Sequence, residues 1–185
     1  MISPVTARMV DLISVLRDRI IDAELNGGVG REPWVAVEEP LQDFLRYPDL
    51  LTLEQEEPDP VRYRQHLLHA DPDGRFSVVA LVWMPGQATP VHDHVAWCVV
   101  GVYRGEEVEE NFRVASDENG PHLVHTGVGV NGEGSVSSLY PPGDIHIVRN
   151  ATSGKVISLH VYGADISARG SSIRRCYDMP IRPRS

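Results

Sequence analysis

The first part of the chain repeats apolar residues at steps of three and four. This spacing runs from Val5 to about Leu25 and has the period of an α-helix with one buried stripe. The glycine-rich segment 27–30 predicts the end of this helix, and a shorter helix is expected around Val35 to Arg46. The Pro- and Glu-rich stretch from Glu54 to Pro60 predicts a loop. We therefore expect helices that lie on the outside of a larger body.

From Tyr63 onward the pattern changes to short segments rich in Val, Ile and Tyr, divided by Gly, Pro, Asp and Asn. The segments expected to be strands are 63–68, 76–83, 98–103, 108–114, 122–128, 135–140, 146–149 and 156–162. About eight such strands predict an all-β core, a small antiparallel barrel or jelly roll. We expect one domain over 1–185, mainly helical over 1–60 and a β-barrel over 61–178, with an irregular tail from 179 to 185.

Composition narrows the possible partners. The chain has 17 Lys and Arg against 26 Asp and Glu, a net charge of −9, which disfavours binding to nucleic acid or to anionic lipid. No apolar stretch approaches the length of a membrane span, and the first residues lack the basic start and apolar run of a secretory signal. The two cysteines, Cys98 and Cys176, are too few for a disulfide scaffold. We expect a cytoplasmic protein.

The main candidate chemistry is a group of histidines. His92 and His94 flank Asp93, so in a strand both imidazoles leave one face while Asp93 points the other way and has a structural role. His146, after a Pro-Pro-Gly-Asp-Ile run, offers a third imidazole from a neighbouring strand, which together predicts a metal held by neutral nitrogens. Other histidines are expected at ordinary strand or loop positions: His66, His69, His122 and His125.

These residues follow two known motifs. The run with Gly86, His92, His94, Cys98 and Gly105 resembles the first cupin motif. The run with Pro141, Gly143, His146 and Asn150 resembles the second. Asn150 is expected to cap a turn. The first motif usually carries a Glu ligand where this chain has Cys98. Loss of that carboxylate leaves three histidines, and this resembles the thiol dioxygenases among the cupins.

Two segments resemble the cysteine dioxygenase family more closely. One is the string 92–101, and the other is Ser158-Leu159-His160-Val161-Tyr162, with similarity over about 63–162 and more weakly to Arg175. The resemblance implies Fe(II) at His92, His94 and His146, a small thiol substrate, and transfer of both atoms of O2 to sulfur. Three neutral donors leave Fe(II) its full charge and about three open positions, which suits a thiolate and dioxygen.

Ser158, His160 and Tyr162 occupy alternate positions of one expected strand and would line one wall of a cavity. There, Ser158 would orient His160, and His160 would orient the Tyr162 hydroxyl toward the substrate. The alternative is a half-exposed strand with a polar outer face.

The choice of substrate depends on the protein group that binds the carboxylate of the substrate. Gln65 stands where cysteine-specific relatives carry Arg, so the chain resembles the Gln branch that oxidises 3-mercaptopropionate. Because Gln cannot form a bidentate ion pair, a carboxylate would need another cation. Arg175 is the first candidate, followed by Arg174 and Arg169, unless these arginines only cap the last strand or pair with the acidic surface.

Cys98 has two interpretations. It is either a buried thiol that fills space, or it forms the thioether to Tyr162 that animal cysteine dioxygenases carry at the matching place.

Three other functions of the protein also remain open: a true cysteine dioxygenase, a cupin that binds metal as a sensor without catalysis, and a Zn or Ni cupin that isomerises or hydrolyses its substrate. The last of these lacks its usual carboxylate ligand at Cys98.

Overall fold

The computed structural model describes residues 3–28 and 32–182, and it begins with helices. Helix α1 spans Ala7–Asn26 and α2 spans Pro33–Phe44, which confirms both predicted helices. Part of the glycine-rich segment after α1, residues 29–30, lies outside the described residues. The prediction of a loop from Glu54 to Pro60 is wrong at its start, because the 3₁₀ helix η1 spans Leu53–Glu56. A capping box between Thr52 and Gln55 stabilises this helix.

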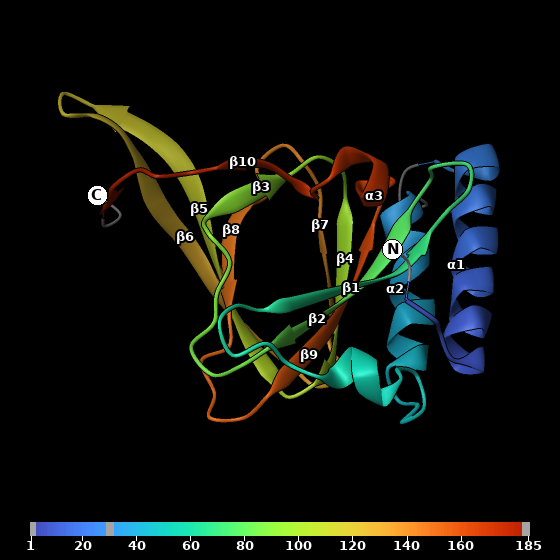
Figure 1. Cartoon of the computed structure of the whole chain (residues 1–185). Coiled ribbons are helices and arrows are strands. Elements are labelled where there is room, and N and C mark those ends of the chain that lie inside the picture. The colour runs from blue at the N-terminus through green and yellow to red at the C-terminus, as the bar shows by residue number, and fades with distance from the viewer. Residues whose placement is uncertain (1–2, 29–31, 183–185) are drawn as a thin grey trace.

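The rest of the chain forms two sheets that face each other as a barrel, with antiparallel pairing throughout except at the last strand (Figure 1). The strands are β1 (Arg64–Ala70), β2 (Ser77–Trp83), β3 (His92–His94), β4 (Cys98–Arg104), β5 (Glu106–Asp117), β6 (Gly120–Gly132), β7 (Val136–Leu139), β8 (Ile145–Arg149), β9 (Val156–Tyr162), β10 (Ile173–Cys176) and β11 (Ile181–Arg182); α3 (Ile166–Arg169) follows β9. One sheet has the order β1-β2-β9-β4-β7 and the other β10-β3-β8-β5-β6-β11. All eight expected strands are present, and the predicted all-β core is confirmed.

The expectation of an irregular tail is wrong at β11. Ile181 and Arg182 pair in parallel with Leu123 and Val124, and Leu123 N donates a hydrogen bond to Pro180 O at 3.0 Å. The edge of β6 supplies the backbone partners for this short strand. The polar and proline-rich sequence of the tail does not indicate this pairing. Residues 183–185 of the tail lie outside the described part.

The two long helices cover the outer face of the five-stranded sheet (Figure 1). Leu12 and Leu16 of α1 and Leu41 of α2 share one buried cluster with Leu159 and Val161 of β9. The contact excludes water from that face, so only the inner face of β9 is left for a site. No helix in the described ranges is long and apolar enough to cross a membrane.

The end of β9 is locked against the start of β4. Cys98 and Tyr162 are paired directly across the two strands, and one residue beyond them Gly163 N donates to Trp97 O at 2.9 Å. A Cβ at Gly163 would lie 2.2 Å from the Trp97 indole, so only glycine fits this contact. The packing of Trp97 over Gly163 therefore fixes the register that puts Cys98 opposite Tyr162.

We expect Gly163→Ala to destabilise the fold by about 1–3 kcal/mol, because the added methyl group overpacks the contact with Trp97. Urea unfolding monitored by circular dichroism measures the change. The matched control is Gly127→Ala, since a Cβ at Gly127 meets nothing within 4 Å. Equal stability of the two variants would contradict this account of the Gly163 contact.

Candidate metal centre

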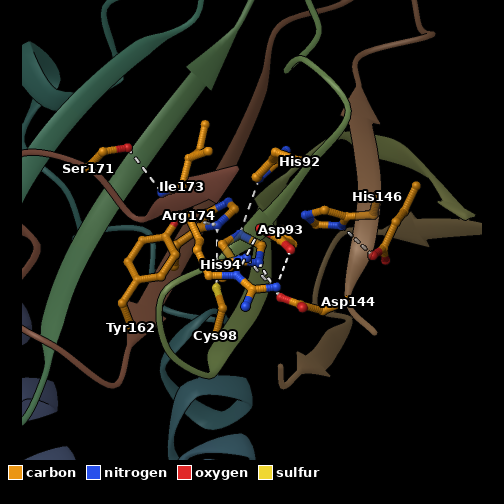
Figure 2. A network of polar contacts seen from close by, with 12 residues as sticks. His92, Asp93, His94, Cys98, Asp144, His146, Tyr162, Ser171, Ile173 and Arg174 are labelled. Atoms are coloured by element: carbon orange, nitrogen blue, oxygen red, sulfur yellow. Dashed lines mark hydrogen bonds and ion pairs between the residues drawn. The ribbon is translucent and has the colours of Figure 1, made fainter. Parts of the chain in front are cut away.

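Three imidazoles converge inside the barrel (Figure 2). His92 of β3 lies directly opposite His146 of β8 in the antiparallel pairing, and His94 follows two residues later on the same face. One ring nitrogen from each of the three lies within 4.8 Å of the others, and the Nε2 atoms of His92 and His94 are 3.2 Å apart. The structure thus brings together the three histidines that the sequence singles out.

A hydrogen-bond acceptor stands behind each imidazole at Nδ1. The Nδ1 atoms of His92, His94 and His146 lie 2.9 Å from Pro90 O, 3.0 Å from Asp144 Oδ2 and 2.7 Å from Glu109 Oε1, respectively. A carbonyl or carboxylate oxygen can only accept, so each Nδ1 carries the proton and each Nε2 keeps its lone pair. His146 Nε2 is buried without a hydrogen-bond partner.

This donor set fits a cation. Burial, together with the neighbouring His146 and His94, lowers the pKa of His92 to about 3, so its imidazole is neutral and its lone pair is available at neutral pH. Among the described residues, no carboxylate or thiol joins the three histidines as a further ligand. Three neutral nitrogens with open positions suit a first-row transition metal.

The predicted hydrogen-bond relay lies on β9, beside the three histidines. Ser158 Oγ is 3.0 Å from His160 Nε2, and His160 Nδ1 is 3.3 Å from the Tyr162 hydroxyl. The three residues are 0%, 5% and 5% exposed, so the alternative of a polar outer face does not hold. Burial and the neighbouring metal-centre histidines lower the pKa of His160 to about 3, which keeps it neutral.

Cys98 adjoins this relay. Its Sγ lies 3.8 Å from His160 Nδ1, and the side chain is fully buried opposite Tyr162. Burial raises the pKa of the Cys98 thiol and also that of the Tyr162 hydroxyl, so both groups are protonated at neutral pH.

A cavity of about 20 Å³, on the scale of one water molecule, is lined both by the three metal-centre histidines and by His160 and Tyr162 of the relay. Its lining combines polar and apolar side chains: Tyr63, Gln65, Leu81, Trp83, Thr89, His92, His94, Val100, Leu139, His146, Val148, His160, Tyr162, Ser172 and Ile173. None of these described lining residues is Lys or Arg. Two wider hollows share Tyr63 and Gln65 with the cavity, so these two residues stand at its rim.

The structure does not bring the predicted arginines to the cavity. The Arg175 guanidinium lies 5.7 Å from the ring centre of Tyr177, on an exposed side chain of β10. Arg174 is ion-paired with Asp93 (Figure 2). Arg169 is exposed at the end of α3. Of the predicted substrate-binding residues, only Gln65 lines the cavity.

The remaining assignments concern structural residues. Asp93 accepts a hydrogen bond from the Tyr177 hydroxyl at 2.7 Å besides its ion pair with Arg174, which fits the structural role expected for it. Asn150 holds a turn, because its amide donates to Gly154 O at 2.7 Å and its oxygen accepts from Thr152 N at 2.9 Å. Four histidines lie on β1 and β6, outside the cluster: His66, His69, His122 and His125.

Sequence reasoning missed two buried carboxyl groups on β5. Glu109 bonds His146, and Glu107, two positions earlier on the same strand, is 2% exposed. Burial raises the pKa of Glu107 to about 7, although the Ser158 hydroxyl lowers it, and the nearby Glu109 raises it further. The acidic segment 106–110 resembles a solvated strand, and only its alternation hints that two of its carboxyl groups face inward.

Glu109→Ala should weaken binding of Co(II) or Zn(II) by roughly 10- to 100-fold, because His146 loses the acceptor that fixes its ring. Competition with a metal chelator measures the affinity. Glu106→Ala, an exposed change on the same strand, is the control and should bind as the wild type does. Unchanged affinity in the Glu109 variant would show that this hydrogen bond does not support the site.

Comparisons with known proteins found both solved structures and a family model that match part of this chain. The solved structures that resemble the chain include a conserved protein with a double-stranded beta-helix domain from Klebsiella pneumoniae (16% identity, 64% of this chain and 92% of that one, TM-score 0.47). Another match is an RmlC-like cupin from Desulfovibrio desulfuricans, with 24% identity over 60% of this chain and 92% of that one and a TM-score of 0.44. Oxalate decarboxylase from Bacillus subtilis also matches, with 15% identity over 65% of this chain and 30% of that one and a TM-score of 0.45. The family described as cysteine dioxygenase type I matches residues 54–169. The chain therefore belongs to the cysteine dioxygenase type I family of thiol dioxygenases.

Proposed function

We propose that the protein is an Fe(II) dioxygenase that converts a small mercapto carboxylic acid, 3-mercaptopropionate, to its sulfinate. The observation that carries this proposal is the cluster of three neutral imidazoles without a carboxylate ligand, next to a buried Ser158–His160–Tyr162 relay. We propose a cytoplasmic location as well, because a reducing compartment keeps small thiols reduced.

His92, His94 and His146 would hold the iron through Nε2. When bound, Fe(II) supplies the redox chemistry that adds both atoms of O2 to sulfur. The small cavity limits the substrate to a short chain and excludes bulk water from the sulfur. Tyr162 lines this cavity, and its hydroxyl, held by His160, would position the sulfur and its reaction partner by hydrogen bonding.

Gln65 would bind the substrate carboxylate at the rim of the cavity. Its amide donates a hydrogen bond but carries no charge, so it suits a carboxylate without selecting for the ion pair that an arginine forms. Since no cation lines the described cavity, the role predicted for Arg175 requires its guanidinium to leave the Tyr177 ring. It stays a prediction.

L-Cysteine is a second candidate substrate. The observation that favours it is Cys98, which lies directly opposite Tyr162 as the thioether of animal cysteine dioxygenases would require. A cavity with so little free volume and no carboxylate on its lining offers the amino group of cysteine no anionic partner, which is why 3-mercaptopropionate comes first.

Anaerobic loading with Fe(II), followed by O2 uptake and product mass, tests the function. We expect 3-mercaptopropionate to gain two oxygen atoms with matching O2 consumption, and cysteine, cysteamine and mercaptosuccinate to react far more slowly. His94→Ala should abolish turnover, while the surface change Glu106→Gln should not affect it. Preference for cysteine would favour the second candidate, and metal binding without O2 uptake on any thiol would favour a sensor.

A thioether between Cys98 and Tyr162 is a separate prediction. After turnover with Fe(II), the intact protein should lose the mass of two hydrogen atoms, with dioxygen as the oxidant, because the two side chains face each other across β4 and β9. Mass spectrometry and alkylation of the denatured protein measure this. Cys98→Ser supplies the matched control without a deficit. Full mass and a freely alkylated Cys98 in the wild type would identify Cys98 as a space-filling thiol.

A further inference from the structure

The strand that carries two of the metal-centre histidines is weakly held by its own sheet. β3 is three residues long, and in the described part of the chain it pairs with β8 at one position, where His92 lies opposite His146. Few ladder hydrogen bonds can form along so short a contact. The support on the other side of β3, from β10, therefore matters for the place of both imidazoles.

β10 pairs with all three residues of β3. The contact extends beyond the paired positions at both ends. Val95 N donates a hydrogen bond to Ser172 O at 3.0 Å, and Tyr177 N donates one to Val91 O at 2.8 Å. The chain then runs on to β6, where β11 pairs (Figure 1). The segment 172–182, which we call the strap, thus borders the full length of β3.

An irregularity in β10 aims an arginine of the strap at β3. Ile173 lies opposite His94. Arg175 already lies opposite Asp93, the next residue of β3, so Arg174 is the extra residue of a β-bulge, a distortion that re-aims side chains. The Arg174 guanidinium reaches the Asp93 carboxylate with both ends of its fork: Nε donates to Oδ1 at 3.3 Å, and Nη2 is ion-paired with Oδ2 (Figure 2).

The strap makes a second contact with the same carboxylate, since the Tyr177 hydroxyl donates to Asp93 Oδ2 at 2.7 Å. Asp93 is 1% exposed, and a buried carboxylate is stable only while its partners neutralise it. Asp93 also stands between His92 and His94 in β3 and faces away from them. Contacts that hold its carboxylate therefore hold the backbone from which both imidazoles extend.

We propose that Arg174 and Tyr177 are positioning residues of the metal centre, which act through Asp93 to place His92 and His94 at the distance that binds the cation. The hydrogen bonds at the Nδ1 atoms set how each ring is turned, whereas the strap sets where β3 lies. This role deepens the proposed function, on which it rests, because it concerns the strand that would hold the iron. It also gives Arg174 a task other than contact with the substrate.

Binding of Co(II) to the full-length protein tests the proposal. Arg174→Gln should weaken binding by about 10- to 100-fold, measured by competition with a chelator, because Gln lacks the charge and the fork that hold Asp93. The visible absorption spectrum of bound Co(II), which reports the geometry of its ligands, should change as well. Arg174→Lys keeps the charge and should recover part of the affinity. Tyr177→Phe removes one hydroxyl and should cause a smaller loss.

Arg182→Gln is the matched control. It removes another ion pair of the strap, with Asp117 of β5, without touching Asp93. We expect it to bind Co(II) as the wild type does, with the same spectrum. Urea unfolding of each metal-free variant, followed by circular dichroism, measures the stability of the fold separately.

Wild-type affinity and spectrum in Arg174→Gln would overturn the proposal, even with a less stable fold, because the contact would then support only the fold. An equal loss of affinity in Arg182→Gln would overturn it too, since any loosening of the strap would suffice. If Arg174→Gln does not fold, unchanged Co(II) binding in Tyr177→Phe overturns it. These measurements need neither O2 nor a thiol, so failure of the proposed oxidation is distinguishable from failure of this role.

Discussion

The antiparallel pairing of β3 with β8 is the interaction on which the site depends. It puts His92 opposite His146, and the strand alternation then adds His94 on the same face. The pairing alone would leave the three imidazole rings free to rotate. Hydrogen bonds from their Nδ1 atoms to Pro90, Asp144 and Glu109 fix the rings, so that the free Nε2 atoms converge.

Burial gives this donor set its chemical character. The two helices seal the outer face of the five-stranded sheet, and the inner face holds imidazoles that a dry environment keeps neutral. A carboxylate ligand at the position of Cys98 would offset the charge of a bound cation. The neutral thiol there does not, so a metal in this cavity keeps its attraction for an anionic ligand such as a thiolate.

Most of this site could be predicted from sequence because its residues follow short periods. His92 and His94, and likewise Ser158, His160 and Tyr162, are set by alternation within one strand, and both cupin motifs link distant strands. The predicted limits of the strands lie close to the observed ones for the same reason. The placement of the arginines near β10 could not be predicted, because it depends on Asp93 and Tyr177, which compete for their guanidinium groups. The inward direction of Glu107 and Glu109 depends on the register of β5, which an acidic sequence does not reveal.

That register explains why an acidic strand can line the interior of the barrel. Glu109 faces the metal centre, where its Oε1 accepts the hydrogen bond from His146 Nδ1. Glu107 leaves the same face two positions earlier, and burial, with the nearby Glu109, raises its pKa to about 7. The carboxyl group of Glu109 therefore stands behind an imidazole instead of among the candidate metal ligands, so the three nitrogens that converge remain the donor set.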